Sequence, residues 1–321
     1  MTDSVYPCRF VAIYKEKIWG GRALERLFGR TLPPGARVGE SWELADLPQG
    51  VSVVANGPRR GTPLTDLTRD WGRSLLGGAC PAGDGRFPLL LKLLDANDIL
   101  SLQVHPDQRA VREIGPAAAL KTECWYVLES RGGYVYKGTA PDVTPRQFRR
   151  AVETALVEQI ERVVRRIDVA AGDFHYLPAG TVHALGPGVV VAEVQTPSDT
   201  TYRVTDWGRG RETHLDRAMQ CIRFGLTGES PPGAQGERLL ETSFFAVYRR
   251  TGARGGQVKL TEGRCAAAMV LAGRGAVRHG GSTEAEVPFR AGDTLLLPAG
   301  LTRCEIVAAD DCAWLEVTLP E

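Results

Sequence analysis

The chain has 321 residues, of which 43% are apolar and 24% charged, and its formal net charge is +1. These fractions are typical of a folded globular protein and exclude disorder along the whole chain, while the near-neutral charge gives no reason to expect nucleic acid or an anionic membrane as a partner. The 37 glycines and 20 prolines favour many short strands joined by turns over a helical bundle.

The amino-terminal residues and the cysteines indicate where the protein works. Residues 1–17 contain no apolar run of the length that a signal peptide needs. The seven cysteines are odd in number and form no Cys-x-x-Cys pair. We therefore expect reduced thiols and a cytoplasmic protein. The longest uncharged stretch, 174–192, holds three glycines and two prolines, which favours a buried strand-turn-strand over a membrane span.

Polar side chains interrupt two apolar segments in the first half of the chain. Gln103 and His105 are two residues apart, so a strand presents both side chains on one face. In the next apolar segment, Glu123, Trp125 and Val127 share one strand face in the same way. The two segments therefore bring an imidazole, an amide and a carboxylate to neighbouring strands.

The stretch 144–164 has a different periodicity. Its apolar residues fall at 148, 152, 156, 160 and 163–164, which is helical spacing. Thr144 stands at the N-cap position and Pro145 directly follows it, as is usual where a helix begins. The pattern predicts one helix over 144–164.

A repeat follows this helix. AGDFHYLPAG at 171–180 and AGDTLLLPAG at 291–300 are identical at seven of ten positions, and VLESRG at 127–132 is echoed by VLAGRG at 270–275. The two pairs are offset by 120 and 143 residues, so the first copy carries 23 residues more than the second, and the helix accounts for them. The remaining residues of both copies form short apolar runs between turns, which predicts strands.

The first copy continues as Gly172-x5-Pro178-x-Gly180-x2-His183. This spacing resembles the second motif of the cupin superfamily, whose members are small jelly-roll barrels. In the second copy Arg303 or Cys304 stands in place of the histidine. The resemblance implies a mostly β fold with two cupin barrels in tandem: a metal-binding barrel over 1–225 with a helical insert at about 142–166, a linker at 226–237, and a degenerate barrel over 238–321.

His105, Glu123 and His183 then lie on three strands of one barrel. Two imidazoles and a carboxylate suit a divalent transition metal, and a catalytic site keeps one position open for water or substrate. An amide oxygen of Gln103 is a weak, neutral fourth ligand. The alternative is that each histidine is an ordinary buried side chain bonded to backbone; convergence on one barrel weakens it.

Four segments, 89–107, 121–128, 172–188 and 193–209, resemble the type I phosphomannose isomerases in their short bacterial form. The segments 17–24 and 39–46 fit the same family, and the matching motifs run from about residue 14 to 217. The resemblance implies a zinc-dependent aldose–ketose isomerase that binds one zinc ion per chain. It also implies a sugar-phosphate substrate, with mannose 6-phosphate and fructose 6-phosphate interconverted by proton transfer between C2 and C1 through an enediol(ate).

Site residues carry over from that family only where the motifs match. The resemblance implies zinc ligands at Gln103, His105, Glu123 and His183, and an active-site arginine at Arg203. It also implies a pocket that contains five further polar residues, which are Lys92, Ser101, Lys121, Glu193 and Asp199.

These residues have to supply a general base, bind the phosphate and contact the rest of the substrate. Glu193 is our first candidate for the general base, because burial in an apolar run raises the pKa of a carboxyl; the alternative is a structural carboxylate paired with an arginine such as Arg203. Lys121 is the second candidate. A phosphate needs a cation and a hydroxyl, which Lys92 and Ser101 can supply, with Arg203 as another possible cation and Asp199 also expected to contact the substrate.

Two other functions are compatible with a metal-binding cupin. A non-haem iron oxygenase also uses two histidines and a carboxylate, and a non-catalytic cupin can bind carbohydrate. The presence of Gln103 and of the polar strand around Arg203 argues against the oxygenase, and the full ligand set argues against a binding-only module. Neither a P-loop nor a GxGxxG motif follows a strand, so a nucleotide ligand is not expected.

Overall fold

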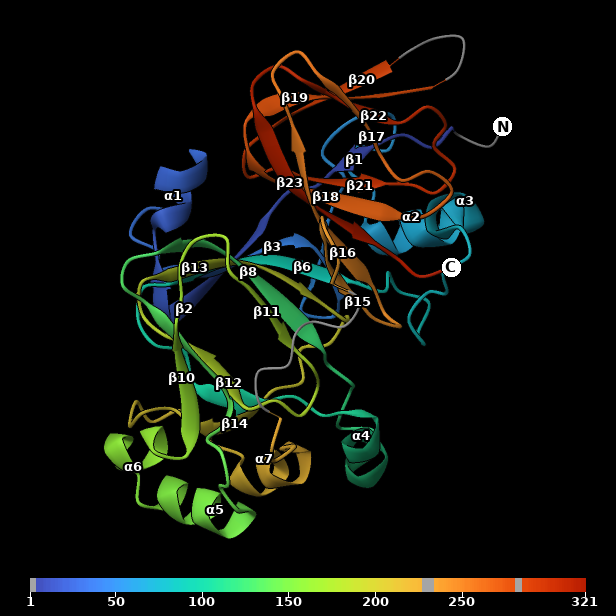
Figure 1. The fold of residues 1–321 in the computed structure, drawn as a ribbon. Helices are drawn as coiled ribbons and strands as arrows, with labels where there is room; N and C mark the ends of the chain where they lie inside the picture. The colour runs from blue at the N-terminus through green and yellow to red at the C-terminus, as the bar shows by residue number, and fades with distance from the viewer. Residues whose placement is uncertain (1–3, 227–233, 281–284) are drawn as a thin grey trace.

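The computed structural model describes residues 4–226, 234–280 and 285–321, so most of the expected linker, 227–233, lies outside the described residues. Strands dominate the molecule, and the helices lie at its periphery (Figure 1). The expectation of a mostly β fold is confirmed. In the part of the chain that the structure describes, no helix is both long and apolar enough to span a membrane.

Two antiparallel sheets form the N-terminal sheet pair. The first runs in the order β11 (Phe174–Leu177), β8 (Glu123–Ser130), β13 (Val189–Gln195), β6 (Leu90–Ala96), β3 (Val38–Leu44) and β2 (Ile13–Gly21). The second runs in the order β10 (Val164–Asp168), β9 (Tyr134–Thr139), β12 (His183–Leu185), β7 (Leu102–Val104) and β14 (Tyr202–Thr205). Apolar side chains from both sheets, among them Trp125, Val135 and Leu185, meet in a common core.

Two further sheets form the C-terminal sheet pair. The six-stranded sheet runs in the order β1 (Cys8–Arg9), β21 (Thr294–Leu297), β18 (Ala266–Ala272), β23 (Cys312–Thr318), β16 (Ala246–Gly252) and β15 (Arg238–Glu241). The four-stranded sheet runs in the order β17 (Gln257–Lys259), β22 (Glu305–Ala308), β19 (Arg274–His279) and β20 (Ala285–Arg290). A short hairpin pairs β4 (Asp46–Leu47) with β5 (Gly50–Val51).

The two copies of the sequence repeat adopt the same local structure. Gly172 and Gly292 both have positive φ, 95° and 89°, which is the reason that each turn needs glycine. Each turn is followed by a four-residue strand, β11 in the first copy and β21 in the second. The sequence repeat is therefore also a structural repeat.

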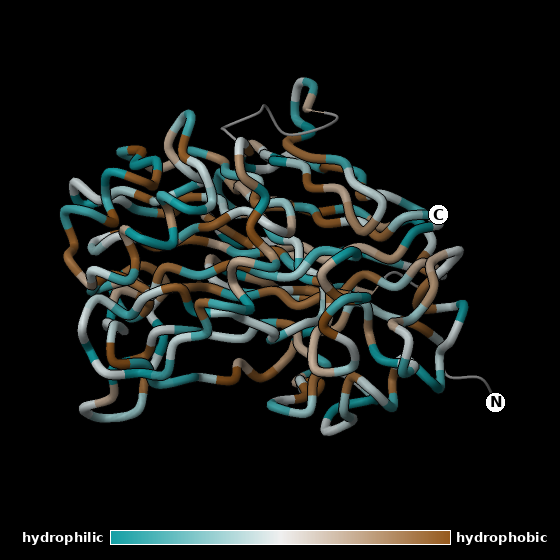
Figure 2. Tube along the Cα trace, turned by 90° about the horizontal axis from the view of Figure 1, so that it is seen from below, coloured by the Kyte–Doolittle hydropathy of each residue, from teal (hydrophilic) through white to brown (hydrophobic). Residues whose placement is uncertain are grey.

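The six-stranded sheets of the two pairs pack face to face. On β8, Trp125 and Val127 point into the N-terminal sheet pair, whereas Cys124 and Tyr126 point toward the C-terminal one. The resulting core also contains Leu315 and other residues of the C-terminal sheet. Strand β1 pairs with β21, so the amino-terminal segment joins the C-terminal sheet. Figure 2 shows apolar residues along the central strands and hydrophilic residues on many outer loops.

Seven helices connect or cover the strands of the described residues. They are α1 (Ala23–Phe28), α2 (Leu64–Trp71), α3 (Arg73–Leu76), α4 (Gln108–Ile114), α5 (Pro145–Glu153), α6 (Val157–Glu161) and α7 (Leu215–Cys221). Helix α5 begins at the expected place, and Thr144 and Gln147 form a capping box.

The prediction of one helix over 144–164 is wrong, because α5 ends at Glu153 and α6 is a separate short helix. Thr154 causes the break: its hydroxyl donates to the Ala151 carbonyl and accepts from the amide of Leu156, so it replaces backbone helical bonds. Ala155 then takes a positive φ of 56°. Leu156, which the helical pattern placed on the apolar face, is 54% exposed.

Candidate metal centre and adjoining cavity

Three potential metal ligands meet where strands of the N-terminal sheet pair begin or end. His105 follows β7, Glu123 begins β8 and His183 begins β12. Their ligand atoms all lie within 4.8 Å of one another, and all three side chains are buried. His105 Nε2 is 3.4 Å from Glu123 Oε2, and His183 Nε2 is 3.1 Å from Glu123 Oε1. The carboxylate thus lies between the two imidazoles.

Backbone carbonyls orient both imidazole rings. The Nδ1–H of His105 donates to the carbonyl of Thr200 at 2.9 Å, and that of His183 donates to the carbonyl of Thr181 at 2.8 Å. Each bond fixes the tautomer, so that the lone pair on Nε2 faces the carboxylate. This arrangement is the usual second-sphere support of a metal-binding histidine.

The unpaired atoms of the cluster fit a divalent cation. His105 Nε2 and both carboxylate oxygens of Glu123 are buried and have no hydrogen-bond partner among the described residues, although Oε2 forms an ion pair with Lys121. Such groups are rare in proteins unless an ion or water completes them. Burial, and next the charge of Lys121, lower the pKa of His105 to about 3, which keeps the imidazole neutral. Burial opposes ionisation of Glu123, but Lys121 and the two histidines outweigh it and lower its pKa.

Gln103 lies beside this cluster, directly opposite His183 across the β7–β12 pair. Its side-chain amide nitrogen is 3.4 Å from His183 Nε2. Rotating the amide by half a turn exchanges its nitrogen and oxygen, so the same position can present an oxygen to a cation. The expected fourth ligand is therefore adjacent to the other three, and its role stays a prediction.

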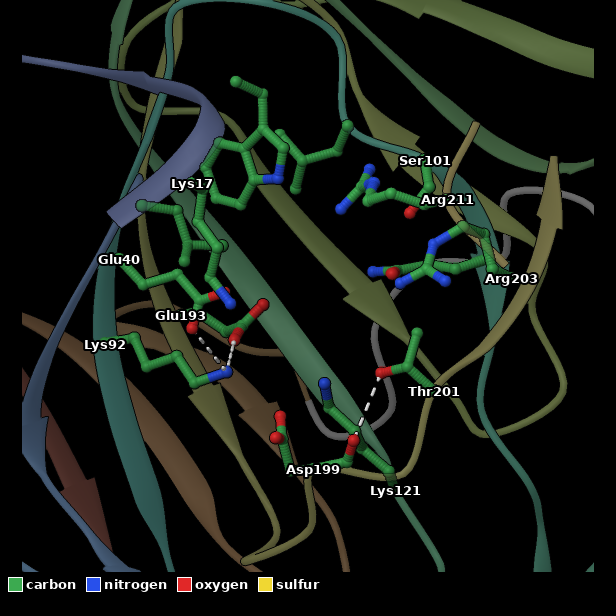
Figure 3. A pocket seen from close by; sticks show the side chains of 14 residues that line it. Lys17, Glu40, Lys92, Ser101, Lys121, Glu193, Asp199, Thr201, Arg203 and Arg211 are labelled. Atoms are coloured by element: carbon green, nitrogen blue, oxygen red, sulfur yellow. Dashed lines mark hydrogen bonds and ion pairs between the residues drawn. The ribbon is translucent and has the colours of Figure 1, made fainter. Parts of the chain in front are cut away.

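A polar cavity of about 250 Å³ adjoins the cluster. It brings together all the expected substrate-site residues (Figure 3). Its lining consists of Lys17, Trp19, Glu40, Lys92, Leu94, Leu100, Ser101, Gln103, Lys121, Glu193, Asp199, Thr201, Arg203 and Arg211.

Glu193 has a different ion-pair partner from the one that the sequence suggested. Its Oε1 is 3.3 Å from Lys92 Nζ, and its Oε2 accepts a hydrogen bond of 2.8 Å from the Trp125 indole. From the sequence, the alternative to a general base was a structural carboxylate paired with an arginine such as Arg203. The structure pairs Glu193 with Lys92 instead. Burial, and next the charge of Glu123, raise the pKa of Glu193 against the opposing effect of Lys92.

Two residues that sequence reasoning did not assign to the site stand beside this pair. Glu40 Oε1 is 2.9 Å from Lys17 Nζ, and Glu40 Oε2 is 3.7 Å from Lys92 Nζ. Burial would raise the pKa of Glu40, but the two lysines outweigh it and lower the pKa to about 2. Lys17 lies in the segment 17–24 and Glu40 in the segment 39–46. Both segments match the family motifs, and this match could have indicated that the two residues belong to the site.

The opposite side of the cavity carries Ser101, Arg203 and Arg211 (Figure 3). Arg203 lies opposite Gln103 across the β14–β7 pair. Its Nη1 donates to the carbonyl of Glu212, whereas its buried Nε has no partner among the described residues. Trp19, Thr201 and Arg211 are further lining residues that the sequence did not single out.

Lys121 and Asp199 complete the expected set. Lys121 Nζ is 3.1 Å from Glu123 Oε2, and its side chain also lines the cavity. It therefore connects the metal cluster with the cavity. Asp199 lines the cavity near Lys121 (Figure 3).

Fold and site together define a β-protein with a candidate metal site beside a polar cavity lined by acidic and basic side chains. A model of the phosphomannose isomerase type I catalytic domain matches residues 8–127. A mannose-6-phosphate isomerase of Streptococcus mutans is 36% identical over 299 residues, 88% of this chain and 89% of that protein. The chain belongs to the type I phosphomannose isomerase family and is therefore an isomerase.

Solved structures agree with this assignment. The crystal structure of the mannose 6-phosphate isomerase from Bacillus subtilis has a TM-score of 0.85 and 30% identity, and the match covers 97% of this chain and 99% of that one. A zinc-bound mannose 6-phosphate isomerase has a TM-score of 0.78 at 15% identity, with 98% of this chain and 100% of that one covered; at that identity it shows a shared fold.

Proposed function

We propose that this protein is a zinc-dependent isomerase that interconverts mannose 6-phosphate and fructose 6-phosphate. The observation that carries the proposal is the buried cluster of His105, Glu123 and His183 beside a cavity lined by acids and bases. The choice of substrate rests on family membership, since relatives named mannose-6-phosphate isomerase are 34–36% identical to this chain.

The architecture that goes with this function is a tandem of two cupin barrels. Residues 1–225 form the first barrel, with a helical insert at about 142–166, and 238–321 form the second, to whose sheet the short strand β1 is added. The two sheet pairs and the structural repeat support this division. Helices α5 and α6 stand between β9 and β10, where the first repeat has its extra residues.

His105, Glu123 and His183 would hold one zinc ion per chain, with Gln103 as the fourth ligand. Two neutral imidazoles and a carboxylate leave a net positive centre, which suits a catalytic rather than a structural site. When bound, zinc supplies a Lewis acid that polarises a substrate oxygen. A relative described as zinc-bound supports the choice of metal.

The cavity divides into two sides that suit the two ends of the substrate. Ser101, Arg203 and Arg211 supply a hydroxyl and two guanidinium groups, which are the donors that a phosphate needs. Lys92 already shares its charge with Glu40 and Glu193, so we place it against the sugar rather than the phosphate. Asp199 can accept hydrogen bonds from sugar hydroxyls.

Glu193 is the residue that we propose as general base. Oε2 is occupied by the Trp125 indole, so Oε1 is the atom that takes the proton from C2 and returns it to C1. Its raised pKa makes it a stronger base than an exposed carboxylate. Lys121 lies beside the ligand Glu123, and we propose that it donates a hydrogen bond to a substrate oxygen.

A coupled assay tests the proposal. Purified protein is mixed with mannose 6-phosphate, fructose 6-phosphate is followed, and the assay is repeated after chelation and after zinc is returned. We expect turnover that is lost on chelation and restored by zinc.

Protein that carries stoichiometric zinc but shows no turnover would contradict the proposal. Activity that needs iron and oxygen would point instead to an oxygenase. If the protein binds sugar, contains no metal and does not convert the sugar, it would be a carbohydrate-binding cupin.

A further inference from the structure

A second charged hollow lies in the C-terminal half, far from the metal cluster in sequence. It has a volume of about 330 Å³ at one end of the four-stranded sheet. Its lining includes Lys259, Glu262, Arg278, Arg303 and Glu305. We refer to the cavity that these five residues line as the C-terminal hollow.

Strand register places this hollow where the metal cluster lies in the other sheet pair. His183 on β12 pairs with Gln103 on one side and Lys137 on the other. Glu305 on β22 likewise pairs with Lys259 and Arg278. The hollow therefore lies beside the strand of the second sheet pair whose pairings correspond to those of β12, and charged residues line it in place of the candidate metal ligands.

Two cations of the hollow are available to a ligand. Arg278 is already engaged, since its guanidinium lies 3.3 Å from Glu305 and 3.0 Å from Glu286. Lys259 and Arg303 have no ion pair within the described residues, and both are exposed. Both residues line the same hollow, and neither forms an ion pair with Glu305.

The backbone at Arg303 is unusual as well. Its φ is 51°, a left-handed conformation that costs free energy in a residue other than glycine and that is concentrated at binding sites. The next residue, Cys304, is buried, so it anchors the loop while Arg303 projects outward. A strained loop thus holds a guanidinium at the hollow.

We propose that the C-terminal hollow is a second ligand site, which binds a phosphate monoester of a small sugar or polyol. Lys259 and Arg303 would bind the phosphate, because a guanidinium and an ammonium are the side chains that bind phosphate most strongly. Glu262, which has no ion pair among the described residues and also lines the hollow, would accept hydrogen bonds from hydroxyl groups. The volume of the hollow, about 330 Å³, is enough for a ligand of that class.

Calorimetric titration of the full chain with inorganic phosphate tests the cation site. Phosphate can also enter the active-site cavity, so the readout is the difference between wild type and the double variant Lys259→Ala with Arg303→Ala. We expect this variant to lose one phosphate site or to bind it at least about tenfold more weakly. The free-energy cost of a positive φ is similar for alanine and arginine, so we expect the variant to keep the loop conformation.

Two controls complete the titration. Arg254→Ala removes an exposed arginine of the same half that does not line the hollow, and we expect it to bind phosphate as the wild type does. Lys259→Arg with Arg303→Lys keeps both charges and should retain the site. Identical isotherms for wild type and the double alanine variant would overturn the proposal, whether or not the chain proves to be an active isomerase.

Glycerol 3-phosphate tests the polyol part of the ligand. We expect Glu262→Gln to weaken its binding at this site several-fold, whereas inorganic phosphate should bind at least as tightly as to the wild type, because the substitution removes a negative charge from the hollow. If Glu262→Gln affects neither probe, the hollow takes a bare anion, and the polyol assignment is wrong.

Discussion

The two oxygens of Glu193 have different surroundings, and the difference assigns a task to each. Oε2 accepts a hydrogen bond from the Trp125 indole, whereas Oε1 lies 3.3 Å from the ammonium group of Lys92 and has no hydrogen-bond partner among the described residues. A base must have a free lone pair at the reacting carbon. Oε1 is the oxygen that meets this requirement.

Replacement of Glu193 tests its role. Glu193→Gln keeps the shape of the side chain and its bond from Trp125 but removes the basic oxygen. We expect kcat to fall by about 10²- to 10⁴-fold, with KM nearly unchanged and zinc content retained. Steady-state kinetics with metal analysis checks this, and a kcat within threefold of wild type would show that another residue is the base.

The pKa of Glu193 gives a pH dependence with a definite sign. The base must be ionised, and its pKa lies above the ordinary value of 4.5, so activity is lost on acidification at a pH above 4.5. We expect the acid limb of kcat/KM to lie there. Zinc content is measured at each pH, because acid also releases a metal from its protein ligands. An acid limb below 4.5 in zinc-loaded protein contradicts the assignment.

Trp125 positions Glu193 and also packs edge-on against His183, with ring centroids 5.4 Å apart. Trp125→Phe removes the indole N–H and keeps most of the ring. We expect kcat to fall about fivefold, the equivalent of ~1 kcal/mol for one hydrogen bond, with KM and zinc content unchanged.

Trp314→Phe is the matched control for that substitution. Trp314 is fully buried in the C-terminal sheet pair, and its indole nitrogen has no partner among the described residues. Its replacement should leave kcat unchanged. Equal effects of the two substitutions would mean that Trp125 acts only through general stability.

At the scale of the element, short strands place the site more than helices do. Strands β12, β7 and β14 put His183, Gln103 and Arg203 in one row, because the three residues are direct cross-strand partners. A second row on β8, β13 and β6 contains Trp125, Glu193 and Lys92. One row carries two of the proposed metal ligands and the other carries the proposed base, and residues of both rows line the cavity.

The peripheral helix α5 depends on its cap. Thr144 Oγ1 accepts from the amide of Gln147, and the Gln147 side chain accepts from the amide of Thr144. Thr144→Ala should lower the free energy of unfolding by about 1 kcal/mol, measured by chemical denaturation, with turnover unchanged at low denaturant. Thr302→Ala, at an exposed threonine, is the control and should leave the free energy of unfolding unchanged. If both variants unfold with the same free energy, the cap does not contribute to stability.

At the scale of the whole molecule, the C-terminal sheet pair covers one face of the sheet that carries Glu193 and Lys92. Val190, Ala192 and Val194 of β13 lie in the shared core, whereas Val189 and Val191 lie inside the N-terminal sheet pair. Arg30 adds a polar link, since it contacts both Glu43 at 2.7 Å and the carbonyl of Gly292. The second half therefore supports the wall of the active site.

A substitution in this shared core tests the coupling. Leu315 on β23 is 1% exposed, and Leu315→Ala should cost about 2–5 kcal/mol of unfolding free energy through the cavity that it leaves. Leu156→Ala, at a leucine that is 54% exposed, should cost far less. Thermal denaturation of both variants checks this; similar melting temperatures would show that the two sheet pairs do not depend on this contact.

Much of the site was readable from the sequence because it rests on local patterns. The turn around Gly172 requires glycine, and alternation along a strand puts Gln103 and His105 side by side. These constraints act within a few residues. Together with the family resemblance they pointed to His105, Glu123 and His183 as candidate ligands, and the structure brings the ligand atoms of these three residues within 4.8 Å of one another.

Helix α5 and its neighbour show where local patterns fail. The apolar spacing over 144–164 predicted one helix, but the Thr154 side chain competes for the backbone bonds, and Leu156 is left in solvent. Periodicity records which residues are apolar and does not record which of them find a core to pack against.

The mostly β class, the repeat and the candidate metal ligands could be inferred from the sequence, because each is recorded in patterns that span short distances along the chain. The partner of Glu193 and the place of Glu40 and Lys17 at the cavity could be learned from the fold alone. The run VVVAEV shows no alternation, because both faces of β13 are buried and neither demands polar residues. Strand register, set by packing across the whole molecule, brings Lys92 rather than Arg203 to Glu193.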